Sequence, residues 1–113
     1  MNQIRYPSDT FDLLIQSWKI RIQNTGRYAD LSGSDQTKEL ERIRKAAQFG
    51  KSIGLRVNAG HGLHEGNVIP IAAIAELSEL NIGHAIVAEA VFKGWQKAIT
   101  DMKTLMIQGR KNA

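Results

Sequence analysis

The stretch Leu55–His64, which reads Leu-Arg-Val-Asn-Ala-Gly-His-Gly-Leu-His, constrains the fold of this chain more than any other. Its first five residues favour a short β-strand, which ends where Gly60 meets His61. In α/β proteins, ligands bind just beyond the carboxyl ends of the strands, and glycine there lets the backbone approach a ligand closely. A histidine in that position can exchange a proton near neutral pH. The stretch therefore predicts a strand that delivers His61 to a binding site.

A second stretch, Asn81-Ile82-Gly83-His84-Ala85, repeats this arrangement of strand end, glycine, histidine and helix. Backbone N–H groups at the start of the helix would face an anion there, and the helix dipole favours negative charge at that end. We therefore expect His61 and His84 to meet at one rim of a parallel sheet and to hold a phosphorylated molecule.

Hydrophobic periodicity and turn residues predict strands that alternate with helices along the chain. The expected order is strand 19–23, loop 25–34, helix 35–53, strand 55–59, helix 68–77, strand 80–82, short helix 84–92 and helix 95–108, with a frayed tail from 109. Asp35 and Asn67 are the expected helix N-caps. This alternation indicates a parallel sheet with right-handed crossovers.

Several apolar side chains are expected to pack inside the protein. They are Leu40, Ile43, Ala47 and Phe49 in the first long helix, Ile99, Met102, Leu105 and Met106 in the last helix, and both tryptophans, Trp18 and Trp95.

The strand 55–59 alternates the polar residues Arg56 and Asn58 with apolar neighbours. If its apolar face packs against helices, its polar face points elsewhere, as at the mouth of a barrel lumen. The sequence thus predicts an α/β fold with about three β/α units, the C-terminal portion of a TIM (β/α)8 barrel. Such a barrel typically has about 250 residues, whereas this chain has 113, so we expect a single partial barrel domain over 1–113.

The composition narrows the classes of function. The chain carries a net charge of +4 with scattered basic residues, which gives little support to a nucleic-acid partner. It has no run of 18 apolar residues and no apolar leader, so we expect no membrane association and a cytoplasmic location. It has no cysteine, and the spacing His61-x-x-His64 offers two of the three or four ligands that zinc needs. We therefore expect neither a metal nor a cofactor.

Three motifs together resemble the C-terminal part of the pyridoxine 5′-phosphate synthase family. They are Thr-Gly-Arg-Tyr-Ala-Asp at 25–30, Val-Asn-Ala-Gly-His-Gly-Leu at 57–63 and Glu-Leu-Asn-Ile-Gly-His-Ala-Ile-Val at 79–87. Their order and spacing also match, and the family-like region spans residues 24–108, whereas residues 1–23 diverge.

The resemblance implies a TIM barrel that makes pyridoxine 5′-phosphate in vitamin B6 biosynthesis. The family condenses 3-amino-2-oxopropyl phosphate with 1-deoxy-D-xylulose 5-phosphate, so both partners are phosphorylated small molecules. By resemblance, His61 is the proton donor, Gly62 lies against the amino-ketone phosphate, and Gly83 and His84 contact a phosphate group. Because the family is oligomeric, association into a homo-oligomer is left open.

The chain also departs from the family pattern. The general bases of the family, a histidine and a glutamate on early strands, have no counterpart here. Asn24 precedes Thr25 where a histidine is usual, and Glu89 replaces a common arginine, which would oppose phosphate binding if it faced the ligand. We therefore expect a truncated enzyme that is inactive alone. The alternatives are a non-catalytic remnant that binds phosphate esters or self-associates, and a small basic nucleic-acid binder.

Overall fold

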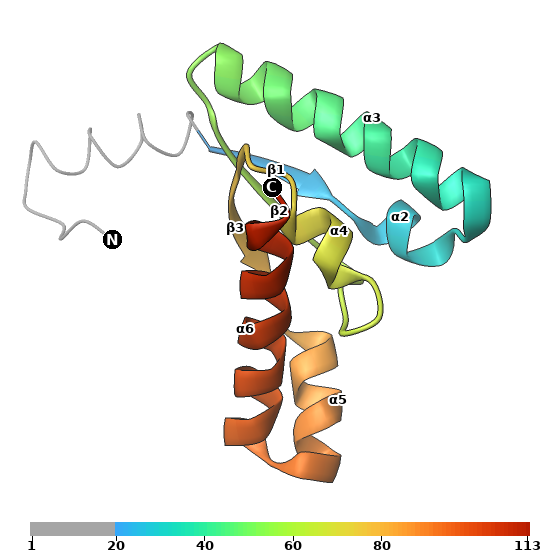
Figure 1. The fold of residues 1–113 in the computed structure, drawn as a ribbon, viewed down its shortest axis with the longest axis vertical. Helices are drawn as coiled ribbons and strands as arrows, with labels where there is room; N and C mark the ends of the chain where they lie inside the picture. Colours follow the sequence, from blue (N-terminus) through green and yellow to red (C-terminus); the bar gives the residue numbers. More distant parts are fainter. Residues whose placement is uncertain (1–19) are drawn as a thin grey trace, which may run out of the picture.

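The computed structural model describes residues 20–113, and this part of the chain alternates strands with helices as predicted. The strands are β1 (Ile20–Asn24), β2 (Arg56–Gly60) and β3 (Leu77–Asn81), and the helices are α2 (Gly26–Asp30), α3 (Gly33–Ser52), α4 (Val68–Ala72), α5 (His84–Lys93) and α6 (Trp95–Lys111) (Figure 1). Within residues 20–113, no helix is both long enough and apolar enough to cross a membrane.

The three strands form one parallel sheet in the order β1-β2-β3, so the predicted α/β class with parallel strands is confirmed. Gly60 at the end of β2 pairs with Asn24 of β1 on one side and with Asn81 of β3 on the other. The three strands therefore end level with one another. The loops that follow them emerge at a single edge of the sheet, which is where a ligand site is expected in this class of fold.

The main core lies between β2 and α3. Val57 and Ala59 point to the same face of β2, and they belong to one buried cluster with Ile43 and Ala47, which are one turn apart on α3. Burying a side chain such as Ile43 contributes about 1.5–3 kcal/mol. The prediction that Phe49 is buried is wrong, since its side chain is 67% exposed. Position 49 follows Ala47 by two residues, which turns it to the opposite side of the helix.

The helix predicted over 68–77 is also wrong in its length. It ends at Ala72, and the next strand begins at Leu77 rather than at 80. Ile71, Ile74 and Leu77 are all buried, but turns bring the last two inward: the Ile74 N–H donates to the carbonyl of Ile71, and the Leu77 N–H donates to that of Ile74. An apolar spacing of three residues suits these turns as well as it suits a helix.

Two boundaries near the N-terminal end of the described region also differ from expectation. The segment predicted as a loop contains the short helix α2. Helix α3 begins at Gly33 with Ser32 at its N-cap, so Asp35 lies in the first turn instead of capping it. A carboxylate in the first turn still interacts favourably with the helix dipole.

Helices α5 and α6 pack side by side and project away from the sheet, and α6 then returns to pack against α4 (Figure 1). The predicted fraying after residue 109 is wrong, because the Arg110 guanidinium donates hydrogen bonds to the carbonyls of Ile74, Ala75 and Leu77. Trp95 is 58% exposed and Ile99 is 41% exposed, so neither is the interior residue that was predicted. Trp18 lies outside the described residues.

Candidate functional site

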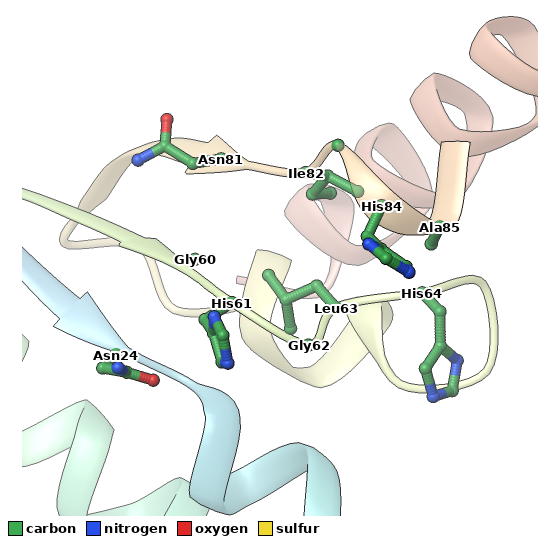
Figure 2. Close-up of a pocket in the computed structure, with 11 residues that line it drawn as sticks. Asn24, Gly60, His61, Gly62, Leu63, His64, Asn81, Ile82, His84 and Ala85 are labelled. Atoms are coloured by element: carbon green, nitrogen blue, oxygen red, sulfur yellow. The ribbon is translucent and has the colours of Figure 1, made fainter. Parts of the chain in front are cut away.

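A pocket of about 680 Å³ lies at the edge of the sheet where the strands end (Figure 2). It brings together all four residues that the sequence marks as a site, His61, Gly62, Gly83 and His84. The complete lining is Asn24, Gly60, His61, Gly62, Leu63, His64, Asn81, Ile82, Gly83, His84 and Ala85. Ligand pockets commonly enclose about 300–1,000 Å³. The two glycine–histidine corners thus share one rim, as expected.

The first glycine–histidine corner, Gly60–His61, is held by Thr25, the residue that directly follows β1. The Thr25 N–H donates to the carbonyl of Gly60 at 2.8 Å, and the Thr25 hydroxyl donates to the carbonyl of His61 at 2.6 Å. Thr25 is completely buried. His61 itself adopts a φ of 91°, a conformation that side chains other than glycine rarely take. Thr25 therefore fixes the backbone carbonyls of both Gly60 and His61, while His61 remains exposed at the pocket.

Two glycines make room for this corner. A Cβ at Gly26 would lie 2.5 Å from Cδ2 of His61, so the absence of a side chain there lets the imidazole lie against the start of α2. Gly62 has a φ of 76°, and a Cβ on it would lie 2.7 Å from that of Ala29. Both positions allow the loop after β2 to pack closely on α2, which the sequence motifs alone did not indicate.

Asn67 supports the site without lining the pocket, a role that the sequence did not reveal because its position suggested a helix cap. Its side chain makes no capping bond to α4. Instead its amide donates to the carbonyl of Gly62 at 3.1 Å and its Oδ1 accepts the His64 N–H at 2.8 Å. The buried Tyr28 hydroxyl donates to the Asn67 carbonyl at 2.7 Å, and burial raises the pKa of this phenol, which keeps it a donor. Asn67 thus closes the loop that presents His61 and Gly62.

The second corner begins helix α5. Gly83 occupies the N-cap position, no side-chain hydrogen bond caps this helix, and no acidic residue lies in its first turn. The first N–H groups of a helix have no partner within the helix, so they are donors for an incoming group. His84 and Ala85, the first two residues of α5, line the pocket. The partially positive end of this helix therefore lies at the same rim as the His61 imidazole.

Three polar residues that the sequence analysis discussed, Arg56, Asn58 and Glu89, do not line the pocket. Arg56 is exposed at the amino end of β2, and Asn58 is buried in the middle of the strand, where its Oδ1 has no hydrogen-bond partner in the described part of the chain. Glu89 does not line the pocket, and its carboxylate lies 3.2 Å from Nζ of Lys93. Glu89 therefore does not oppose an anion in the way that the sequence alone suggested.

The histidines of the rim do not assemble a metal site. The Gly66 N–H donates to Nδ1 of His64 at 2.9 Å, which occupies one of its two ring nitrogens. Figure 2 shows the His64 ring apart from the His61 ring, with Gly62 and Leu63 between them along the loop. Across residues 20–113, no three His, Cys, Asp or Glu side chains come close enough together to hold a metal ion.

These features define the class: an α/β protein whose parallel strands carry two histidines and a helix N-terminus to one pocket beyond their carboxyl ends. The family model of the pyridoxal phosphate biosynthesis protein PdxJ matches residues 16–108. The chain therefore belongs to this family, the pyridoxine 5′-phosphate synthases, which confirms the resemblance found in its motifs. This membership supports a role in pyridoxal phosphate biosynthesis and implies a biosynthetic enzyme that handles phosphorylated substrates.

Proposed function

We propose that this chain is the phosphate-binding and proton-donating part of a pyridoxine 5′-phosphate synthase, built as the C-terminal three β/α units of a TIM barrel. The observation that carries the proposal is the shared pocket, in which His61, Gly62, Gly83 and His84 all take part. In TIM barrels a phosphate commonly binds between the last two βα loops and the N-terminus of a short extra helix. Helix α5 follows the last strand, β3, and begins at this pocket.

Phosphate recognition falls to the second corner. The backbone N–H groups at the start of α5 would donate to phosphate oxygens, and the helix dipole would favour the negative charge. The His84 imidazole adds a further donor at the same place. Gly62 on the facing loop lines the pocket with its backbone, against which 3-amino-2-oxopropyl phosphate would lie. The second substrate of the proposed condensation is 1-deoxy-D-xylulose 5-phosphate.

Proton donation falls to His61. Closing a pyridine ring with loss of water requires protons to be delivered to leaving oxygen atoms, and an imidazole is suited to this near neutral pH. Its backbone is fixed by the Thr25 hydrogen bond to its carbonyl, whereas its ring is accessible to a ligand. A fixed donor beside an anion site is the arrangement that such a reaction needs, since misplacement by about 1 Å can cost a factor of 10² in rate.

The proposal is tested by titrating the 15N-labelled chain with inorganic phosphate and following its amide resonances. Binding should shift the resonances of Gly62, Gly83 and His84, and sodium chloride at the same ionic strength should not. The variant His84→Ala should weaken binding. His61→Ala, a matched loss of one imidazole from the same pocket, should leave phosphate binding nearly unchanged because its proposed role is proton transfer. No phosphate-dependent shift at the three residues would refute the site.

A second measurement addresses catalysis by the 113-residue chain. We expect it to form no pyridoxine 5′-phosphate from the two substrates, because the family's general bases have no counterpart in this sequence. Product formation by the pure protein would overturn this expectation.

A non-catalytic protein that binds phosphate esters or associates with itself is the second candidate. The observation that favours it is a set of exposed apolar side chains on α5 and α6, namely Val87, Val91, Phe92, Trp95, Ile99 and Ile107. Size-exclusion chromatography tests whether this surface mediates self-association. Self-association predicts an elution volume that depends on protein concentration, and a monomer at all concentrations would argue against it.

A further inference from the structure

Lys93, the last residue of α5, contacts three carboxylates at once. Its Nζ lies 2.8 Å from Oε2 of Glu65, 2.8 Å from Oδ2 of Asp101 and 3.2 Å from Oε2 of Glu89. The side chain is only 20% exposed, so its charge is largely enclosed by these partners. The three carboxylates come from three different segments: the loop after β2, helix α6 and helix α5 itself.

Two of these carboxylates lie next to the pocket without lining it. Glu65 directly follows His64, which lines the pocket. Glu89 lies one helical turn after Ala85 on the same side of α5, about 5–6 Å further along the helix axis. Asp101 has a second cationic partner, since Nζ of Lys97 lies 3.3 Å from it. Glu65 and Glu89 are thus the carboxylates whose position matters most for an anion in the pocket.

We propose that Lys93 is a positioning residue that holds Glu65 and Glu89 away from the anion pocket and neutralises them, so that the start of α5 remains favourable to a phosphate group. The inference rests on the proposed function and names the electrostatic support of that same site. Without Lys93, the Glu65 carboxylate next to His64 and the Glu89 carboxylate one turn after Ala85 would carry uncompensated negative charge near the pocket. That charge would oppose the binding of a phosphate dianion.

The protonation of this cluster agrees with its geometry. Hydrogen bonds to Asp101 and Glu65 raise the pKa of Lys93 well above its usual range, so it stays charged wherever the protein is folded near neutral pH. The same bond to Lys93 lowers the pKa of Asp101. Lys93 and Asp101 therefore hold each other in their charged forms under the conditions in which a phosphate would bind.

The test uses the whole chain and inorganic phosphate, with the dissociation constant measured by amide shifts. Lys93→Met should raise the dissociation constant for phosphate roughly twofold to tenfold at low salt. This range is what Coulomb repulsion from the uncompensated carboxylates gives at an effective dielectric constant close to that of water. The loss should shrink as salt is added. Lys97→Met is the matched control: it removes the same charge from a lysine that contacts Asp101 but lies 65% exposed, and it should leave phosphate binding nearly unchanged.

The triple variant Glu65→Gln/Glu89→Gln/Lys93→Met distinguishes an electrostatic role of Lys93 from a purely structural one. If Lys93 acts by neutralising the two carboxylates, their removal should restore phosphate binding to the level of the unmodified chain or better. If binding stays weak in the triple variant, Lys93 merely ties the loop to the helix and the proposal is overturned. Should Lys93→Met fail to fold, Glu65→Gln and Glu89→Gln alone still test it, since each should tighten phosphate binding.

The outcomes also separate this inference from the proposed function. Phosphate binding by the unmodified chain, together with an unchanged constant in Lys93→Met, overturns the role of Lys93 and leaves the site intact. No binding by the unmodified chain overturns both.

Discussion

The close contact between Gly26 and His61 makes a sharp prediction for the variant Gly26→Ala. The new methyl group would lie 2.5 Å from Cδ2 of the imidazole and 3.3 Å from its Nε2. It would also lie 3.0 Å from Oδ1 of Asn24, which accepts the N–H of residue 26. Because a side chain can move more easily than the backbone of a helix, the imidazole should yield, and it should move by about 1 Å to restore ordinary contact.

The cost to stability should be small. Replacing glycine by alanine where the backbone is compatible stabilises a protein by about 0.4–1 kcal/mol. A side chain forced away from its preferred rotamer costs about 0.5–1.5 kcal/mol. These contributions oppose each other, so the free energy of unfolding should change by less than about 1 kcal/mol. The variant should therefore displace the proposed proton donor without unfolding the chain.

Two measurements on the same samples check this. Urea denaturation gives the free energy of unfolding, and NMR gives the resonances of the His61 ring and its contacts with residue 26. We expect near-normal stability together with clear shifts of the His61 ring protons. Arg27→Ala is the control, because Arg27 is the next residue along α2 and its side chain is 77% exposed.

Either of two results would refute the reasoning. Unchanged His61 ring resonances in Gly26→Ala would show that the imidazole does not rest on residue 26. A loss of more than about 2 kcal/mol would show that the backbone, rather than the side chain, takes up the strain. In an assembled enzyme, a 1 Å displacement of the donor would be expected to lower the rate by about 10²-fold.

Two further predictions concern residues that support the site or the core. Asn67→Ala should lower the free energy of unfolding by about 2 kcal/mol, because it removes partners from the Gly62 carbonyl and the His64 N–H; a urea-denaturation loss below about 0.5 kcal/mol would contradict this. Glu39 is 6% exposed, and the Arg42 hydrogen bond lowers its pKa below the ordinary value of 4.5. Its contribution to stability is therefore present above pH 4.5 and is lost as the pH falls through the lowered value. Stability measured against pH should fall less steeply on the acid side in Glu39→Gln, and parallel curves would contradict this.

The features that the sequence predicted well are those set by local chemistry. A strand that ends in Gly60 and a helix that begins after Gly83 are both specified within a few residues, and the parallel order of strands then brings their histidines to one rim. The segments 84–92 and 95–108 were predicted as helices, the second of them amphipathic, and the structure has helices there.

The features that failed depend on partners distant in the sequence. Arg110 anchors the end of α6 through carbonyls more than thirty residues earlier, which no local pattern reveals. Ile74 and Leu77 satisfy an apolar spacing through turns against the core and not through a helix. The role of Asn67 was missed for a different reason. Its partners, Gly62 and His64, are near in the sequence, but they lie in the preceding loop, which a helix cap would not contact.

The backbone conformation of His61 has a consequence for how this protein tolerates change. Its φ of 91° costs most side chains about 1–3 kcal/mol, and glycine or asparagine would relieve it. Thermal stability and the proposed proton donation thus place opposite demands on the same residue. A collection of variants enriched purely for heat resistance would drift toward losing the imidazole, so improving durability here requires substitutions placed elsewhere in the fold.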